Sequence, residues 1–184
     1  MGYKNIKSLK AKYGETCKSK CENQDVLFLY SYILEKERVD SDWWSEGHGC
    51  DDVIGILERT FNDSNWNLLE DDIENWTDDQ IELFTLSILV GNSGNGINED
   101  EKLRDEQIEY TLNKRANILL KISNIHSSII IWDNIIFFEK ISYLSSKYIT
   151  QIAKNIGYYD NLNSDWKNSE EMNLMKKLIK NSFK

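Results

Sequence analysis

The chain contains no proline among its 184 residues. Proline makes up about 5% of an average sequence, and it breaks helices because it lacks a backbone N–H and fixes its φ angle. Its complete absence therefore favours a largely helical protein.

Long apolar runs and cysteines are also scarce. No run approaches the roughly 18 apolar residues that a transmembrane helix needs, so we predict no membrane association. The lysine-bearing residues 1–20 lack the apolar segment of about 7–15 residues that marks a secretory signal. The three cysteines are an odd number, which argues against a disulfide framework and suits a reducing compartment. Together these features predict a cytoplasmic protein.

The charge is unevenly distributed along the chain. The net charge is −9, yet residues 35–109 hold 22 acidic against 5 basic residues, a local balance of −17, and the remaining residues sum to +8. An acidic block repels nucleic-acid phosphates and accelerates the encounter with basic partners. We therefore predict no nucleic-acid binding. A highly soluble, solvated face is the alternative explanation.

Helical spacing and capping residues divide the first half of the chain into segments. Apolar spacing predicts a buried helix over 24–39, and acids at Asp51 or Asp52 can open the next one, through Phe61. Ser64 is expected to cap the following helix.

The sequence WTDDQI gives the strongest helix signal. Thr77 and Gln80 form a capping box, and that helix is expected to run to Val90 and stop at Gly91, a favourable C′ residue. The Gly/Asn-rich residues 91–98 then predict a loop, and a domain boundary at this segment is the alternative.

The second half of the chain is also expected to be helical. Asn98 and Glu101 could cap a long helix that reaches Ile122. Residues 127–138 suit either a hairpin or a buried helix, and the continuing pattern favours the helix. Further helices are expected over 148–156 and from Ser169 onward. The predicted fold is a single all-α domain over 1–184, a bundle or stacked helical hairpins with seven to eight helices.

The stretch SDWWSEGHGCDD, residues 41–52, combines residues that could bind a metal. His48 and Cys50, with Cys17 and Cys21, supply the four ligands of a Cys3His zinc set. However, structural zinc sites usually pair two tight knuckles, and His48 and Cys50 are separated by a single residue. Buried or incidental thiols are the favoured explanation, so we predict no metal site and no cofactor.

Catalytic motifs are not recognisable in this sequence. The histidines lie in no nucleophile signature, and GNSGNG lacks the Lys-Ser/Thr ending of a phosphate-binding loop. We therefore predict no catalytic residue and no enzymatic activity. One alternative remains: acidic pairs at i, i+3, Asp79 with Glu82 and Glu106 with Glu109, resemble the magnesium-binding pairs of all-α nucleotide pyrophosphatases, although their order departs from that family's pattern.

Recognition of a partner is the remaining class of function. Trp43 and Trp44 are flanked by acids, and tryptophan is enriched at protein interfaces, where a few aromatic anchors carry most of the affinity. Adjacent side chains cannot point the same way, so one tryptophan can be buried while the other is presented. Packing of both beneath the loop is the structural alternative.

Residues 40–90 resemble a known family. Their pattern W-W-x-E-G-x-G, followed by spaced tryptophans and acidic helices, is similar to small helical immunity proteins of bacterial contact-dependent growth inhibition and polymorphic-toxin systems. The resemblance implies a cytoplasmic antitoxin that binds a cognate protein toxin, commonly a basic nuclease forming the C-terminal domain of a large secreted protein. The acidic block would then pair with the toxin's Lys and Arg. A helical scaffold that acts through its C-terminal helices is a further alternative. The predicted toxin-binding residues are Asp42, Trp43, Trp44, Glu46, Asp51, Asp52, Asp71, Asp72, Asp78 and Asp79.

Overall fold

The computed structural model describes residues 5–39, 43–44, 48–93, 101–126, 129–141 and 144–183, and of residues 101–104 only the backbone. Within these ranges the chain is helical and contains no strand, so the predicted all-α class is confirmed. Eight of the helices have seven or more residues, as the sequence predicts. None of the helices in the described ranges is long and apolar enough to cross a membrane.

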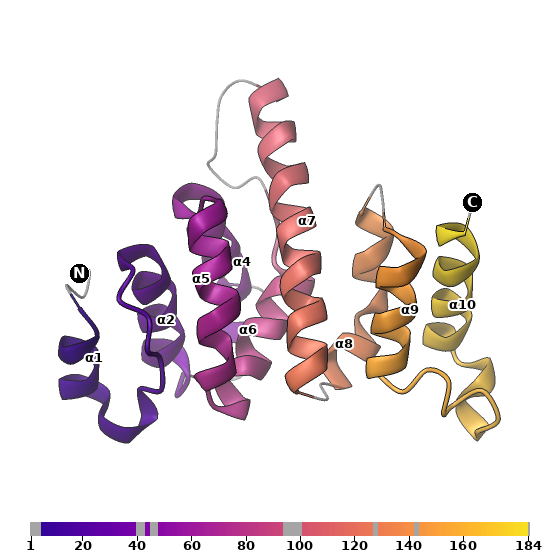
Figure 1. Cartoon of the computed structure of the whole chain (residues 1–184), viewed down its shortest axis with the longest axis horizontal. Coiled ribbons are helices and arrows are strands. Elements are labelled where there is room, and N and C mark those ends of the chain that lie inside the picture. The colour runs from indigo at the N-terminus through magenta and orange to yellow at the C-terminus, as the bar shows by residue number, and fades with distance from the viewer. Residues whose placement is uncertain are drawn as a thin grey trace.

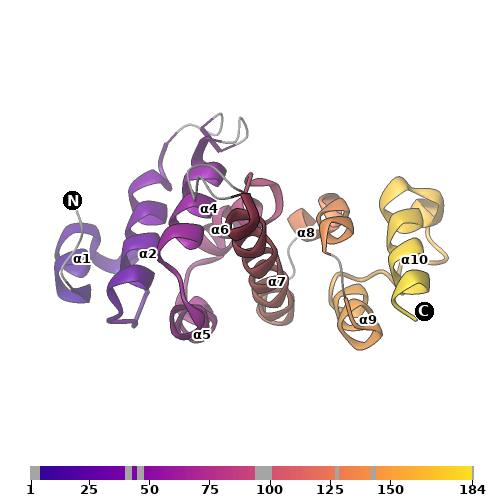
Figure 2. The same cartoon turned by 90° about the horizontal axis from the view of Figure 1, so that it is seen from above.

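The helices progress along the long axis of the molecule from α1 to α10, with α4, α5 and α6 layered over one another, and the two ends of the chain lie at opposite ends (Figure 1). The view from above shows the same progression (Figure 2). The α-helices are α1 (Ile6–Tyr13), α2 (Gln24–Lys36), α4 (His48–Thr60), α5 (Asp63–Asp72), α6 (Asp78–Val90), α7 (Glu101–Ile125), α8 (Ile129–Asp133), α9 (Ser146–Asn155) and α10 (Glu170–Ser182). Short 3-10 helices are η1 (Gly14–Thr16), η2 (Ile73–Asn75), η3 (Ile135–Lys140) and η4 (Asp165–Asn168).

Helix α6 lies at the centre of the packing, where it contacts α2, α4, α7 and α8. The C-terminal part is built on α7, since α9 packs against both α7 and α10. Each helix contributes its apolar stripe to one continuous core. This stacked arrangement leaves the outer surfaces of several helices open to solvent.

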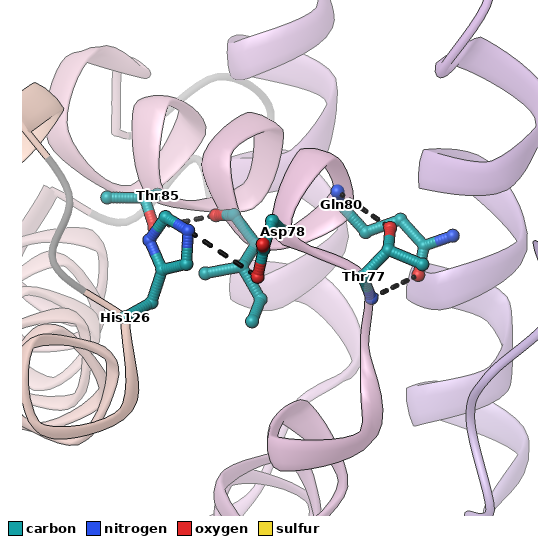
Figure 3. Close-up of polar contacts among 6 residues, drawn as sticks. Thr77, Asp78, Gln80, Thr85 and His126 are labelled. Atoms are coloured by element: carbon teal, nitrogen blue, oxygen red, sulfur yellow. Dashed lines mark hydrogen bonds and ion pairs between the residues drawn. The ribbon is translucent and has the colours of Figure 1, made fainter.

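The capping box at the start of α6 is present as predicted. The Thr77 hydroxyl accepts from the Gln80 backbone N–H at 3.3 Å, and the Gln80 side chain accepts from the Thr77 N–H at 3.1 Å (Figure 3). Gln80 is fully buried and also accepts from the Tyr30 hydroxyl at 2.9 Å, which joins α6 to α2. Ser169 caps α10 as expected, and α9 begins after its own cap, Ser145.

Two predicted helix starts were wrong. Helix α4 begins at His48 rather than at Asp51 or Asp52. Helix α5 is capped by Asn62 and not by Ser64, because Asn62 has extended backbone angles and its side-chain oxygen accepts from the Asn65 N–H at 3.1 Å. The Asn98–Glu101 capping box and most of the 91–98 loop lie outside the described residues.

Residues 127–138 form neither a hairpin nor one continuous helix in their described part. Helix α8 ends at Asp133 and η3 begins at Ile135. Between them, the Asn134 side-chain amide donates to the Ile130 carbonyl oxygen at 3.0 Å. An α-helix would use this carbonyl for the backbone N–H of Asn134, so the side chain replaces a helical hydrogen bond and the helix breaks.

Gly91 ends α6 as predicted but for a different reason. Its φ is −59°, so it does not adopt the left-handed conformation of a C′ glycine. A Cβ atom at this position would lie 2.5 Å from Ile54 Cγ1 and 2.7 Å from the Cys50 carbonyl oxygen. Glycine is required here because α4 passes directly against the backbone.

Candidate functional site

The two adjacent tryptophans have different environments. Trp44 is 3% exposed, and its indole N–H donates to the Lys36 carbonyl oxygen at the end of α2, at 3.2 Å. Trp43 is half-buried: the Lys36 ammonium lies 4.7 Å from its ring centroid and the His48 ring 5.6 Å away. Trp44 therefore belongs to the core, whereas Trp43 keeps part of its surface available to a partner.

Trp43 is tied to α2 and α4 through two polar side chains. Its indole N–H donates to the Tyr32 hydroxyl at 3.4 Å, and that hydroxyl donates to the Asp52 carboxylate at 2.6 Å. Burial raises the pKa of Tyr32, and the bond to Asp52 raises it further. Asp52 is exposed, but it also stabilises the contact between the two helices. Asp42 and Glu46, also predicted contacts, lie outside the described residues.

The predicted acidic residues do not form one patch, because they lie at opposite ends of α6. Asp51 accepts from the Asn92 backbone N–H at 2.8 Å, just beyond the end of this helix. Asp78 and Asp79 occupy its first turn. A helix of 13 residues is about 20 Å long at roughly 1.5 Å per residue. The separation is therefore too large for one side chain of a partner to reach both groups.

Asp72 has a structural position rather than a surface one. It is 4% exposed, and one oxygen accepts from the backbone N–H groups of Lys20 and Cys21 at 2.7 and 3.0 Å. The other oxygen accepts from the Trp76 indole N–H at 3.0 Å. The prediction that Asp72 contacts a toxin is therefore wrong, because a buried carboxylate that accepts from three donors cannot meet a partner. Its neighbour Asp71 is exposed.

Side chains at the end of α7 and directly after it contact two acids of the central block. Lys121 forms an ion pair with Glu74, and His126 Nε2 lies 3.6 Å from Asp78 Oδ1 (Figure 3). The latter contact is an ion pair only when His126 is protonated. No such partner joins Asp79 or Glu82 within the described part of the chain. These two carboxylates therefore carry the unneutralised charge beside α6.

A groove lies beside the first half of α6 and gathers these carboxylates. Its volume is about 470 Å³. It is lined by the acids Glu37, Asp79 and Glu82, by Arg38, and by the apolar Leu83, Leu86 and Ile130. We call this the α6 groove. Its three carboxylates and one guanidinium leave an excess of negative charge above an apolar floor.

The sequence already contained the signal for much of the α6 groove. Asp79, Glu82, Leu83 and Leu86 occupy positions i, i+3, i+4 and i+7, which share one side of a helix. The sequence predicts Asp79 as a toxin contact, whereas it indicates Glu82 only as a magnesium ligand in the pyrophosphatase alternative. Glu37 and Ile130 come from distant parts of the chain, so only the tertiary structure brings them to the groove.

The two acidic pairs of the pyrophosphatase alternative do not share a groove. Asp79 and Glu82 belong to the α6 groove, whereas Glu109 lines a separate one with Leu112 and Lys140. In the described ranges, no three His, Cys, Asp or Glu side chains are grouped so that they could hold a metal ion. The thiols of Cys17 and Cys50 are buried within the core.

The comparisons with known proteins add no family assignment. No protein-family model, curated protein or solved structure matches this chain.

Proposed function

We propose that this chain is an immunity protein that binds and neutralises a basic toxin domain and has no enzymatic activity of its own. The α6 groove is the observation that carries the proposal. It joins exposed carboxylates to an apolar floor on one surface of a helix.

The chemistry of the α6 groove suits lysine and arginine side chains. Both have apolar stems and a cationic head, so the stem can cover Leu83 and Leu86 while the head meets Asp79 or Glu82. A nuclease presents such side chains because it binds phosphates. When these lysine and arginine side chains occupy the α6 groove, they can no longer bind the nucleic-acid substrate. An acidic inhibitor would block a nuclease in this way.

The acidic block also favours fast recognition. Complementary charge raises the association rate and excludes partners of the wrong sign, and salt weakens both effects. The resemblance of residues 40–90 to immunity proteins is the basis for proposing a toxin as the basic partner. Trp43, half-buried beside Lys36, would add an aromatic contact to the same partner.

The two alternative functions, a hydrolase and a scaffold, predict different arrangements of the acidic residues and different effects of mutations. A magnesium-dependent hydrolase needs its two acidic pairs to face one substrate, and here Asp79 and Glu109 line separate grooves. A scaffold that acts through α9 and α10 would keep its partner when the α6 groove is altered. The immunity proposal requires that the partner is lost when the α6 groove is altered.

Charge reversal in the α6 groove tests the proposal. The basic nuclease domain that the wild-type chain captures from its native cell is expressed with the wild-type chain or with the double variant Asp79→Lys/Glu82→Lys. We expect the wild type to restore growth and inhibit the nuclease. The double variant should bind more than about tenfold more weakly, mostly through slower association.

The matched control is Asp165→Lys, an exposed acid on η4. It changes the net charge in the same direction without altering the α6 groove. If the control weakens binding as much per charge as the groove variant, the total charge and not the groove is responsible. Binding that neither the double variant nor moderate salt reduces would contradict the proposed acidic interface.

A further inference from the structure

A second pocket lies in the C-terminal part of the molecule, away from the acidic block. Its volume is about 450 Å³, within the range of roughly 300–1,000 Å³ that is typical of small-molecule sites. Helix α8 separates it from the α6 groove: Ile130 lines the groove, whereas its neighbours Ile129 and Trp132 line the pocket. The two sites are therefore distinct.

The walls of this pocket are aromatic and aliphatic. Trp132 comes from α8 and Trp166 from η4, with Ile129 and Ile156 beside them. Trp166 is 67% exposed and Ile129 is 69% exposed. Large apolar side chains cost free energy when they face water, and two of them at the rim of one pocket indicate a surface that a ligand covers.

Two carboxylates complete the pocket. Asp133 follows Trp132 on α8, and Glu171 lies in the first turn of α10. Hydrogen bonds from the backbone N–H of Glu171 and from the Ser169 hydroxyl lower the pKa of the Glu171 carboxyl. Glu171 is therefore ionised at neutral pH. No lysine or arginine lines the pocket to neutralise it within the described part of the chain.

We infer that this pocket binds a small organic cation, an ammonium or guanidinium group that carries apolar substituents. The faces of tryptophan rings attract cations that are poorly hydrated, and the carboxylates supply the opposite charge. An anion would meet two carboxylates, and a neutral apolar molecule would leave them without a counter-charge. A cation with apolar substituents can pack against the tryptophan and isoleucine side chains and also pair with the two carboxylates.

The positions of these residues follow from the turn after α9. Gly157 has a φ of 78°, a left-handed conformation that favours glycine, and the Asn161 side chain donates to its carbonyl oxygen at 3.0 Å. The chain then reaches η4, where Ser164 caps the turn that carries Trp166. This connection brings Trp166 and Glu171 to the pocket that Trp132 of α8 also lines.

Calorimetric titration of the full chain tests the inference with three probes. Choline carries a quaternary ammonium group and agmatine a guanidinium group. The neutral alcohol in which carbon replaces the charged nitrogen of choline has nearly the same shape. We expect at least one cation to bind about tenfold more tightly than the neutral alcohol.

Variants locate the binding. Trp166→Ala and Glu171→Gln should each weaken the binding of the cation several-fold. The matched control Glu170→Gln removes the neighbouring charge on α10, outside the pocket lining, and should leave the affinity unchanged. Circular dichroism checks that each variant remains folded.

Equal affinity for the cations and the neutral alcohol would overturn the inference, as would the absence of binding by both cations. Loss of affinity in Glu170→Gln equal to that in Glu171→Gln would also overturn it, because nonspecific attraction to α10 would then explain the binding. None of these outcomes depends on the toxin-binding proposal, since no residue of the α6 groove is changed.

Discussion

The Arg115 guanidinium donates two hydrogen bonds to the Ile88 carbonyl oxygen, from Nε at 2.8 Å and from Nη2 at 2.5 Å. It also donates to the Gly91 carbonyl oxygen at 3.0 Å. Arg115 is 1% exposed, and burial lowers its pKa to about 10, which leaves it charged at neutral pH. This cation from α7 thus satisfies carbonyl groups at the C-terminal end of α6, where positive charge is favourable.

We expect Arg115→Met to lower the free energy of unfolding by about 3–5 kcal/mol, since it removes buried hydrogen bonds and a Coulombic attraction to Glu58. Arg115→Lys should cost less, because lysine keeps the charge but cannot reproduce the planar set of donors. Urea unfolding measures both changes. A cost for Arg115→Met below about 1 kcal/mol would contradict the central role of this side chain.

Trp43 and Trp44 should differ in stability and binding. We expect Trp44→Ala to lower the free energy of unfolding by about 3–5 kcal/mol, because its buried ring leaves a cavity. Trp43→Ala should cost about 1 kcal/mol or less, since the ring is only half-buried, yet under the proposed function it should weaken binding of the basic partner. Thermal unfolding and a binding assay on the same variants separate the two roles. Equal destabilisation by both would place Trp43 in the core.

Two glycines should respond oppositely to alanine. Gly91→Ala should destabilise the protein by about 1–3 kcal/mol, because the new methyl group would force α4 away from α6. Gly55→Ala, within α4, should be neutral or stabilising by up to about 1 kcal/mol, since alanine favours the helix. The nearest atoms to the methyl group there would be those of the flexible end of Arg59, from 3.0 Å. Denaturant midpoints of the two variants check the contrast.

Asp63 should contribute to the acid sensitivity of the fold. Its carboxylate lies 2.5 Å from the Lys114 ammonium and accepts from the Tyr110 hydroxyl at 2.9 Å, and these contacts lower its pKa below the ordinary 3.8. The resulting stabilisation is present above the ordinary pKa and is lost as the pH falls through the lowered one. Asp63→Asn should therefore flatten the dependence of stability on pH below about pH 4. An unchanged pH profile would contradict this.

The thiols should react slowly with a disulfide reagent under native conditions. Burial raises the pKa of Cys17, Cys21 and Cys50 above the ordinary 9.0, so little thiolate is present near neutral pH. Cys21 is the only one of the three that is not buried, and it should react first. Denaturant should make all three reactive. Rapid native reaction of Cys50 would show that the contact between α4 and Trp44 opens readily.

The sequence by itself determined the all-α class and several helix ends, because proline is absent and because capping is local chemistry. The Thr77–Gln80 box and the Ser169 cap involve residues three positions apart, so each could be predicted from a short window. Asn62 and Ser64 are both good capping residues, and only the backbone conformation at Asn62 distinguishes them.

Only the tertiary structure decided which acids share a surface. Asp71 and Asp72 are adjacent and chemically identical, yet Asp71 is exposed, whereas buried Asp72 accepts from the backbone of the distant Lys20 and Cys21 and from the nearby Trp76 indole. The α6 groove likewise needs Glu37 and Ile130, which lie about forty residues before and after α6 in the sequence. Burial and long-range contact depend on how helices pack, and a one-dimensional charge pattern does not contain that information.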